Sequence, residues 1–213
     1  MRTRVLLAER QQLMREGLAS LLGRDPTLEV VAQTGDGAGA VQAAQQLRPD
    51  VAVIDLQVPG MNGVDATRRI RAARPEVKVL CLVEQELPWM MKAALDAGAF
   101  GLLLKDSSFE ELTRAIHTVM QHKLYLSPAL AAAAVDSCRC APQADGAFSL
   151  LTPKEREVVQ LLAEGNSTKQ AAARLDISFK TVATHRERVM AKLRIRSIAD
   201  LTRYAIREGL ARL

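Results

Sequence analysis

The sequence predicts a doubly wound α/β domain with a five-stranded parallel sheet, followed by a small all-α domain. Three observations support this prediction. Short aliphatic runs alternate with helical stretches over residues 1–126, this rhythm is lost over residues 127–149, and only helical periodicity remains over residues 150–213. Apolar runs separated by helical periods are typical of βαβ units and a sheet covered on both faces. A chain of 213 residues is long enough for two modest domains.

Five strands are expected in the N-terminal part of the chain. They are RVLLA (4–8), LEVVAQT (28–34), VAVID (51–55), KVLCLV (78–83) and GLLLK (101–105). Helices are expected between and after them, at Leu13–Arg24, Ala38–Gln46, Val64–Ala73, Trp89–Ala97 and Phe109–Gln121. In such a fold, ligands bind at the carboxyl ends of the strands, so polar residues at these ends are the first candidates for a site.

Composition gives a general class. The hydrophobic content is 48% and the charged content 25%, which is typical of a soluble globular protein. No apolar run reaches the ~18 residues of a membrane span, and the N-terminal sequence lacks the apolar core of a signal peptide. Three cysteines cannot form a disulfide framework, which favours a reducing compartment. We therefore expect a cytoplasmic protein without a membrane partner.

Residues 127–149 are rich in Ala, Pro, Gly and Ser and are expected to be a linker, with helix in the first half left open. Cys138 and Cys140 lie in this segment without a nearby second cysteine pair or a histidine. Incidental cysteines are therefore a better interpretation than a metal or redox site.

The basic charge is confined to the C-terminal part. Residues 1–126 hold 15 Lys/Arg and 15 Asp/Glu, whereas residues 150–213 hold 13 and seven, a net charge of +6. Helices are expected from Thr152 to Glu164, from Ser167 to Leu175, over Phe179–Leu193 and over Ile198–Gly209. A short helix, a tight turn and a longer basic helix match the helix-turn-helix plan, which places the second helix in the major groove of DNA. A solvated basic helix without a partner is the alternative.

The segment LTPKEREVVQLLAEGNSTKQAAARLDISFKTVATHRERVMAKL resembles the LuxR-type helix-turn-helix of NarL/FixJ response regulators. The resemblance implies binding to double-stranded DNA, with dimerisation through the last helix and paired half-sites. The candidate DNA-binding residues are Lys169, Lys180, Thr181, Thr184, His185, Arg186, Arg188 and Lys192. Ala183 and Glu187 depart from the pattern, because each removes or opposes a phosphate contact.

Residues 1–126 resemble a receiver domain, through VLLA, LMREGL, RPDVAVIDLQVPGMNGVDATRRIR, ALDAGAFGLLLKD and EELTRAI. The resemblance identifies Asp55 as the phospho-acceptor position, Glu9 as one acid of the magnesium site and Lys105 as the lysine that ends the fifth strand. Magnesium and the lysine neutralise the phosphoryl oxygens in such a reaction.

Three positions depart from the receiver pattern. Arg10 replaces the second acid, Val83 replaces the Thr or Ser that holds a phosphoryl oxygen, and Leu102 replaces the aromatic switch residue. We expect Arg10 to pair with Asp55 and to weaken magnesium binding. This predicts an atypical receiver with no cofactor. In the alternative, Arg10 turns to solvent and a weak metal site survives through Glu9 and Asp55.

Trp89, Met90 and Met91 open the fourth expected helix and include the only tryptophan of the chain. Exposed together, they would form a dimer contact or a site for an apolar ligand. In the alternative, Trp89 folds down and fills the space left by Leu102 and Val83.

These observations favour a transcriptional regulator that is not an enzyme, because no nucleophile and base lie together outside the Asp55 pocket. Two rivals are kept: a conventional regulator switched by phosphorylation of Asp55, and an adaptor whose receiver mainly binds a protein. A sensor kinase, another protein or a small apolar ligand is the expected partner of the receiver. His117 and His122 are five residues apart, which is not the spacing of a helical metal pair.

Overall fold

The computed structural model describes residues 2–85, 87–139, 150–211 and, for residues 137–139, the backbone only. The chain divides into two compact units, residues 1–143 and 144–213. Cys138 and Cys140 lie outside the part whose side chains are described, so the interpretation of this pair remains a prediction.

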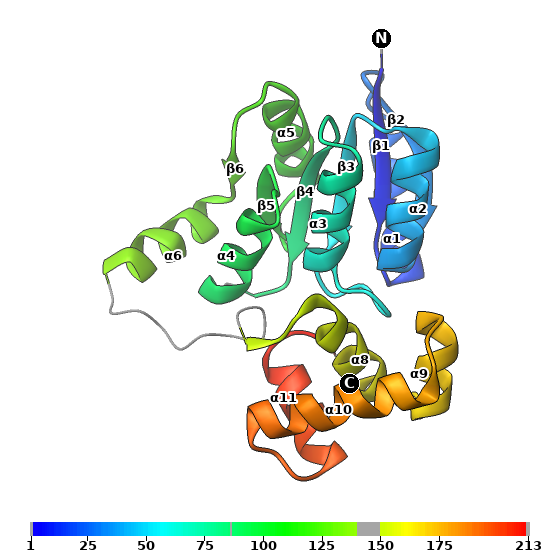
Figure 1. Ribbon diagram of the computed structural model, residues 1–213. Helices are drawn as coiled ribbons and strands as arrows, with labels where there is room; N and C mark the ends of the chain where they lie inside the picture. Colours follow the sequence, from blue (N-terminus) through cyan, green and yellow to red (C-terminus); the bar gives the residue numbers. More distant parts are fainter. Residues whose placement is uncertain (1, 86, 140–149, 212–213) are drawn as a thin grey trace. The chain divides into compact units, whose positions relative to one another are not determined.

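The first unit is a parallel sheet with helices on both faces (Figure 1). The strand order is β2-β1-β3-β4-β5-β6, and every pairing is parallel. The strands are β1 (Thr3–Ala8), β2 (Leu28–Thr34), β3 (Val51–Asp55), β4 (Lys78–Val83), β5 (Gly101–Leu104) and β6 (Tyr125–Leu126). The expected parallel α/β sheet is therefore confirmed, with six strands in place of five.

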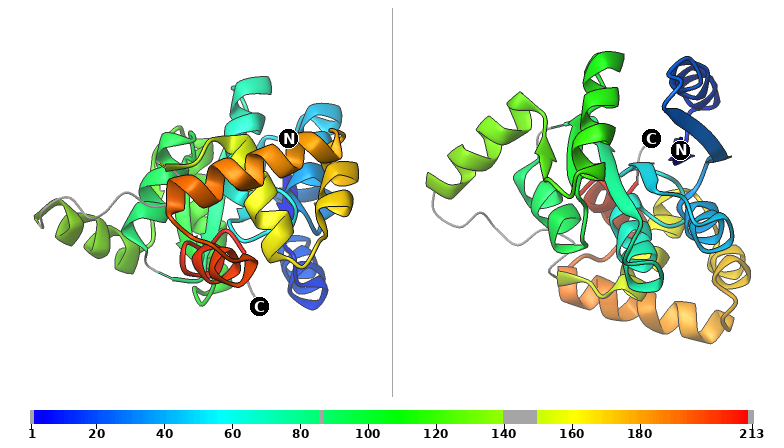
Figure 2. Two further views of the ribbon diagram at one scale, coloured as in Figure 1. Left: turned by 60° about the horizontal axis from the view of Figure 1, so that its bottom comes forward. Right: turned by 90° about the horizontal axis from the view of Figure 1, so that it is seen from above.

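The helices of this unit are α1 (Gln12–Leu22), α2 (Gly37–Leu47), α3 (Gly63–Ala73), α4 (Pro88–Asp96), α5 (Phe109–Met120) and α6 (Pro128–Arg139). Helices α1 and α5 share one apolar core on one face of the sheet, while α2, α3 and α4 contact one another on the other face (Figure 2, right). Every residue of β3 and β4 is buried, which explains their continuous apolar sequences.

The sixth strand ends the expected receiver segment, and α6 occupies the first half of the expected linker, where the sequence left a helix open. Tyr125 and Leu126 pair with Gly101 and Leu102 of β5. Helix α6 contacts α4 and β5, and its Leu130 is fully buried. The first unit thus continues beyond residue 126, because β6 pairs with the edge that β5 would otherwise expose and α6 packs against α4 and β5.

The second unit consists of α8 (Pro153–Ala163), α9 (Thr168–Leu175), α10 (Phe179–Leu193) and α11 (Ile198–Arg207). Thr152 and Glu155 form the capping box that the sequence indicates at the start of α8. Asp176 adopts a left-handed conformation between α9 and α10, which makes the tight turn of the helix-turn-helix. Val182 and Val189 of α10 are fully buried against the other helices of this unit.

Gly63 supports a testable prediction about the first unit, because the turn after β3 leaves no room for a side chain there. A Cβ at Gly63 would lie 2.5 Å from the Asp55 carbonyl oxygen and 2.6 Å from the Leu56 Cα. We expect Gly63→Ala to lower the free energy of unfolding of this unit by about 1–3 kcal/mol. Fluorescence of Trp89, the only tryptophan, during urea unfolding measures this unit.

Gly17→Ala is the matched control, because Gly17 lies inside α1 and a Cβ there would meet nothing within 4 Å. We expect it to raise the free energy of unfolding by about 0.5–1 kcal/mol, since alanine is the better helix former. Equal stability of the two variants would contradict the close packing described at Gly63.

Candidate functional site: the acid pocket and the DNA-binding helices

The acid pocket is a cluster of charged residues at the carboxyl edge of the sheet. We use the name for Glu9, Arg10, Asp55, Glu84 and Lys105. Each follows or ends a strand: Glu9 and Arg10 follow β1, Asp55 ends β3, Glu84 follows β4 and Lys105 follows β5. The parallel topology brings these strand ends together, so residues far apart in sequence meet at one edge.

Lys105 is the centre of the pocket. Its Nζ lies 2.8 Å from Glu9 Oε2, 2.8 Å from Asp55 Oδ2 and 3.9 Å from Glu84 Oε1. Glu9 and Asp55 are fully buried, and each also accepts a backbone hydrogen bond through its other oxygen, from Gln11 and from Gln57, both at 2.9 Å. Both carboxylates are therefore held in place by groups of the chain itself.

Arg10 joins the same network. Its Nε lies 3.8 Å from Asp55 Oδ2, and its terminal amino group donates to Glu84 Oε1 at 3.4 Å. The arginine side chain is 22% exposed and so is turned toward the pocket. The geometry agrees with the expected pairing of Arg10 and Asp55, while Glu84, a second partner, was not predicted. Glu84 directly follows a buried strand, which is the signal that could have identified it.

The pKa of Asp55 is raised. Burial is the largest cause and outweighs the nearby Lys105 and the backbone donor of Gln57, both of which lower the pKa, while Glu9 raises it further. A buried aspartate whose charge is only partly compensated is the expected result of placing three carboxylates against two cations.

The residues present do not fit a bound magnesium ion. Among the residues that the structure describes, no group of three or more His, Cys, Asp or Glu side chains is arranged to hold a metal. Lys105 pairs with one oxygen of Glu9 and one of Asp55, and Arg10 adds a second positive charge beside the same Asp55 oxygen. Magnesium requires near-octahedral oxygen ligands, which this cluster does not offer.

The switch positions are buried and apolar. Val83 is 2% exposed and Leu102 is fully buried. As aliphatic residues, they supply neither a hydroxyl nor an aromatic ring that could turn toward a phosphate. The structure thus places the side chains of both substituted positions in the core of the sheet.

The expected exposed cluster on α4 is wrong for two of its three members. Met90 and Met91 are buried, 4% and 3% exposed, because α4 packs against α3 on one side and α6 on another. Trp89 is half-buried. Only Trp89 remains a candidate interface residue on this helix.

The DNA-binding candidates fall into two groups. Lys169, Lys180 and Arg188 are exposed, and the described part of the chain gives their side chains no ion pair. The others have contacts within the unit: Thr181 Oγ1 with Ser178 Oγ at 2.8 Å, Thr184 Oγ1 to the Lys180 carbonyl at 3.0 Å, Arg186 to Thr168 Oγ1 at 3.4 Å and Lys192 Nζ to Glu155 Oε2 at 2.7 Å. The Nδ1 of His185 is buried without a partner among the described residues.

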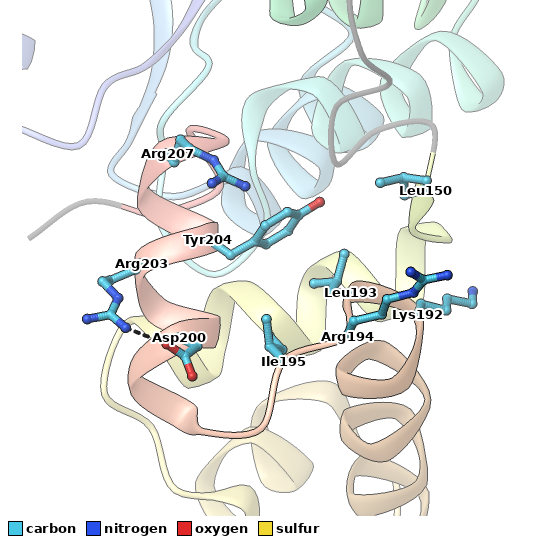
Figure 3. A pocket seen from close by; sticks show the side chains of 9 residues that line it. All are labelled: Leu150, Lys192, Leu193, Arg194, Ile195, Asp200, Arg203, Tyr204 and Arg207. Atoms are coloured by element: carbon cyan, nitrogen blue, oxygen red, sulfur yellow. Dashed lines mark hydrogen bonds and ion pairs between the residues drawn. The ribbon is translucent and has the colours of Figure 1, made fainter.

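A groove in the second unit is a third feature of interest (Figure 3). It lies between the C-terminal end of α10 and α11 and has a volume of about 600 Å³. No sequence motif predicted it.

A receiver-like sheet with charged strand ends, joined to a helix-turn-helix unit, defines the class of two-domain regulators that bind DNA. Comparisons with known proteins agree. Residues 5–117 match the family model "Response regulator receiver domain", and residues 149–205 match "Bacterial regulatory proteins, luxR family". The chain belongs to the response regulators that join a receiver domain to a LuxR-type DNA-binding domain, and it is a DNA-binding transcriptional regulator.

Relatives align over almost the whole chain. The transcriptional regulatory protein LnrK of Bacillus subtilis is 32% identical over 98% of both chains, and the oxygen regulatory protein NreC of Staphylococcus epidermidis is 33% identical over 97% of this chain and 98% of its own. The solved structure of the response regulator ChrA, from a heme-sensing two-component system, is 32% identical with a TM-score of 0.54 over 98% of both chains. An RcsB–DNA complex is similar in fold, with a TM-score of 0.60 and 23% identity over 96% of this chain and 98% of its own.

Glu155 gives a prediction about the pH dependence of the DNA-binding unit. Burial of Glu155 raises its pKa, but hydrogen bonds from Lys192 and Thr152 outweigh burial and leave the pKa lowered from 4.5. Stability from this group is present above the unfolded pKa and is lost as the pH falls through the lower folded pKa. We expect the protection of α8 amides, the ratio of the intrinsic to the observed exchange rate, to fall between about pH 5 and about pH 3, and Glu155→Gln to remove part of that loss.

Asp96→Asn is the control for this measurement, because Asp96 is an exposed carboxylate paired with Lys92 in the first unit. It should leave exchange in α8 unchanged. An identical pH profile for the parent and Glu155→Gln would show that the Lys192–Glu155 pair does not contribute.

Proposed function

We propose that the receiver of this regulator works without magnesium-dependent phosphorylation of Asp55. The observation that carries the proposal is the position of Arg10, which lies 3.8 Å from Asp55 and contacts Glu84 on the other side. A fixed cation at this place opposes a divalent ion, because the ion would have to approach a guanidinium at close range. Arg10 and Lys105 instead supply the positive charge from within the chain.

The substituted switch positions support the same proposal. Val83 and Leu102 stand at the positions where the receivers that this chain resembles carry a hydroxyl and an aromatic ring, and neither side chain offers a hydrogen-bond donor. Even a phosphorylated Asp55 would therefore lack the groups that convert phosphate charge into a change at the surface. The conventional rival, phosphorylation of Asp55, requires Arg10 to leave the pocket. The adaptor rival is supported only by Ala183 and Glu187, which remove or oppose phosphate contacts of the recognition helix.

The remaining parts of the proposal concern partners and location. We propose a cytoplasmic homodimer that binds paired half-sites through Lys169, Lys180, Thr181, Thr184, His185, Arg186, Arg188 and Lys192. None of the described helices is both long and apolar enough to cross a membrane. A small cavity of about 130 Å³ beside α1 and α5 is below the ~300 Å³ of ordinary ligand pockets. This cavity is thus too small for a drug-sized apolar ligand, and we propose a sensor kinase or another protein as the partner of the receiver.

We also propose that the protein catalyses no reaction. Burial raises the pKa of the Cys81 thiol to about 12, so this thiol stays protonated and unreactive. Asp55, the buried carboxylate at the family's phospho-acceptor position, forms an ion pair with Lys105.

The first test of this proposal is phosphotransfer. With acetyl phosphate and magnesium, we expect the parent chain to show no stoichiometric labelling of Asp55, because Arg10 opposes the ion. Arg10→Asp should raise magnesium affinity by about ten-fold or more, measured by isothermal titration calorimetry.

Arg2→Asp is the matched control, because it makes the same charge reversal at the opposite end of β1. It should leave magnesium affinity unchanged. Prompt, complete labelling of Asp55 in the parent, absent in Asp55→Asn, would refute phosphorylation-independence.

A second test concerns Trp89. We expect Trp89→Ala to shift the parent from dimer to monomer in gel filtration, since large aromatic side chains dominate interface energetics. Val135→Ala, which removes an exposed apolar side chain of α6, is the control. If Trp89→Ala elutes at the same position as the parent, Trp89 is not an interface residue and only packs against its own unit.

A further inference from the structure

The groove between α10 and α11 has the size of a ligand site. Its volume of about 600 Å³ falls within the roughly 300–1,000 Å³ typical of small-molecule pockets. It is lined by Leu150, Lys192, Leu193, Arg194, Ile195, Asp200, Arg203, Tyr204 and Arg207. Four of these residues are cationic and one is acidic, so the groove favours an anion.

Two of the four cations are already engaged. Arg203 pairs with Asp200 and, in Figure 3, is turned toward it and away from Tyr204. Lys192 pairs with Glu155 at 2.7 Å.

The other two cations keep donors that the described residues do not use. Arg207 donates through Nε to Glu208 at 3.3 Å, and its guanidinium carbon lies 5.5 Å from the centre of the Tyr204 ring. Its two terminal amino groups have no acceptor among the described residues. The Arg194 guanidinium likewise has no partner there, and its backbone is in the left-handed conformation that ends α10. The terminal amino groups of Arg207 and the guanidinium of Arg194 can therefore bind a ligand without first breaking an ion pair.

Tyr204 is an independent sign of a ligand. The residue is only 9% exposed, yet its hydroxyl has no hydrogen-bond partner in the part of the chain that the structure describes. Figure 3 shows the hydroxyl pointing away from α11, toward the side of the groove where Leu150 lies. Burial and the nearby Glu208 raise the pKa of Tyr204 to about 12, so the hydroxyl remains a donor. A buried donor without an acceptor is uncommon in proteins and costly.

We propose that this groove is a phosphate-binding site that takes a phosphate-bearing ligand of nucleotide size. The Tyr204 hydroxyl and the Arg194 and Arg207 guanidinium groups donate to the phosphate oxygens. Arginine forks suit phosphate because they offer paired donors of fixed geometry. The apolar side chains of Leu150, Leu193 and Ile195 provide a surface for the rest of the ligand. A phosphate of the DNA backbone is the other source of the same chemistry.

Such a ligand would join two parts of the DNA-binding unit. Arg194 lies directly at the end of α10, whereas Tyr204 and Arg207 lie on α11. A phosphate held by all three would fix the end of α10 relative to α11. Nucleotide binding would thus act on the DNA-binding unit directly, and this inference does not depend on how the receiver works.

The test is calorimetric titration of the full chain with ADP as the probe, and with adenosine as the probe that lacks phosphate. We expect ADP to bind at least about ten-fold more tightly than adenosine, because the phosphate contacts are charge-assisted. Arg194→Ala and Arg207→Ala should each weaken ADP binding about ten-fold, and Tyr204→Phe, which removes only the hydroxyl, about three-fold to ten-fold.

Arg203→Ala is the matched control, since it removes the same charge from the rim of the groove but from a side chain paired with Asp200. It should change ADP affinity less than about two-fold, the scale of an exposed pair. Thermal melting of each variant checks that the unit remains folded. Equal losses in Arg203→Ala and Arg194→Ala would overturn the site, because they would show only diffuse attraction of an anion.

A DNA titration separates the two sources of phosphate. If ADP does not bind, but Arg194→Ala reduces the salt dependence of DNA affinity by about one unit and Arg203→Ala does not, the site takes a backbone phosphate. If neither ADP binding nor the salt dependence of DNA binding responds to Arg194, Arg207 and Tyr204, the proposal is wrong.

Discussion

The ion pairs of Lys105 with Glu9 and Asp55 hold the carboxyl edge of the sheet together. Both distances are 2.8 Å, and both carboxylates are fully buried. Two buried acids side by side repel each other, and the lysine between them removes most of this repulsion. Because the three residues lie at the ends of three different strands, the pairs also fix how β1, β3 and β5 end relative to one another. Arg10 and Glu84 add one further charge of each sign, so the cluster keeps one net negative charge without any ion from solution.

The raised pKa of Asp55 shows what this arrangement costs. Burial outweighs the help of Lys105, so the ionised aspartate is less favourable in the folded chain than in water. By linkage, a raised carboxyl pKa lowers stability as the pH rises through the interval above the unfolded pKa. The ionised Asp55 by itself therefore does not stabilise the fold, and the order at this edge comes from the contacts of Lys105 with both acids.

Much of the fold could be predicted because its strands are long, apolar and separated by regular helices. KVLCLV and VAVID read as buried strands, and both are buried at every position. The two-residue strand Tyr125–Leu126 was missed because a pairing this short has no pattern of its own. Met90 and Met91 were placed wrongly because the sequence does not show that α6 returns to cover α4. In the acid pocket, the strand topology was enough to predict that Glu9, Asp55 and Lys105 lie close together. The direction of the flexible Arg10 side chain and its contact with Glu84 depend on nearby charges, which the hydrophobic pattern of the sequence does not show.

The DNA-binding unit has a net charge of +6, but some of its cations are bonded to other residues of the unit and are not available to contact DNA phosphates. Lys192 neutralises Glu155, which in turn caps α8, and Arg186 reaches back to Thr168 at the start of α9. These cations brace the helices against one another, and releasing them for a phosphate would cost the contacts that position α10. Lys169, Lys180 and Arg188 are exposed and form no ion pair among the described residues. The phosphate contacts that set the salt dependence should therefore come mainly from these three, with the braced residues acting through the shape of the unit.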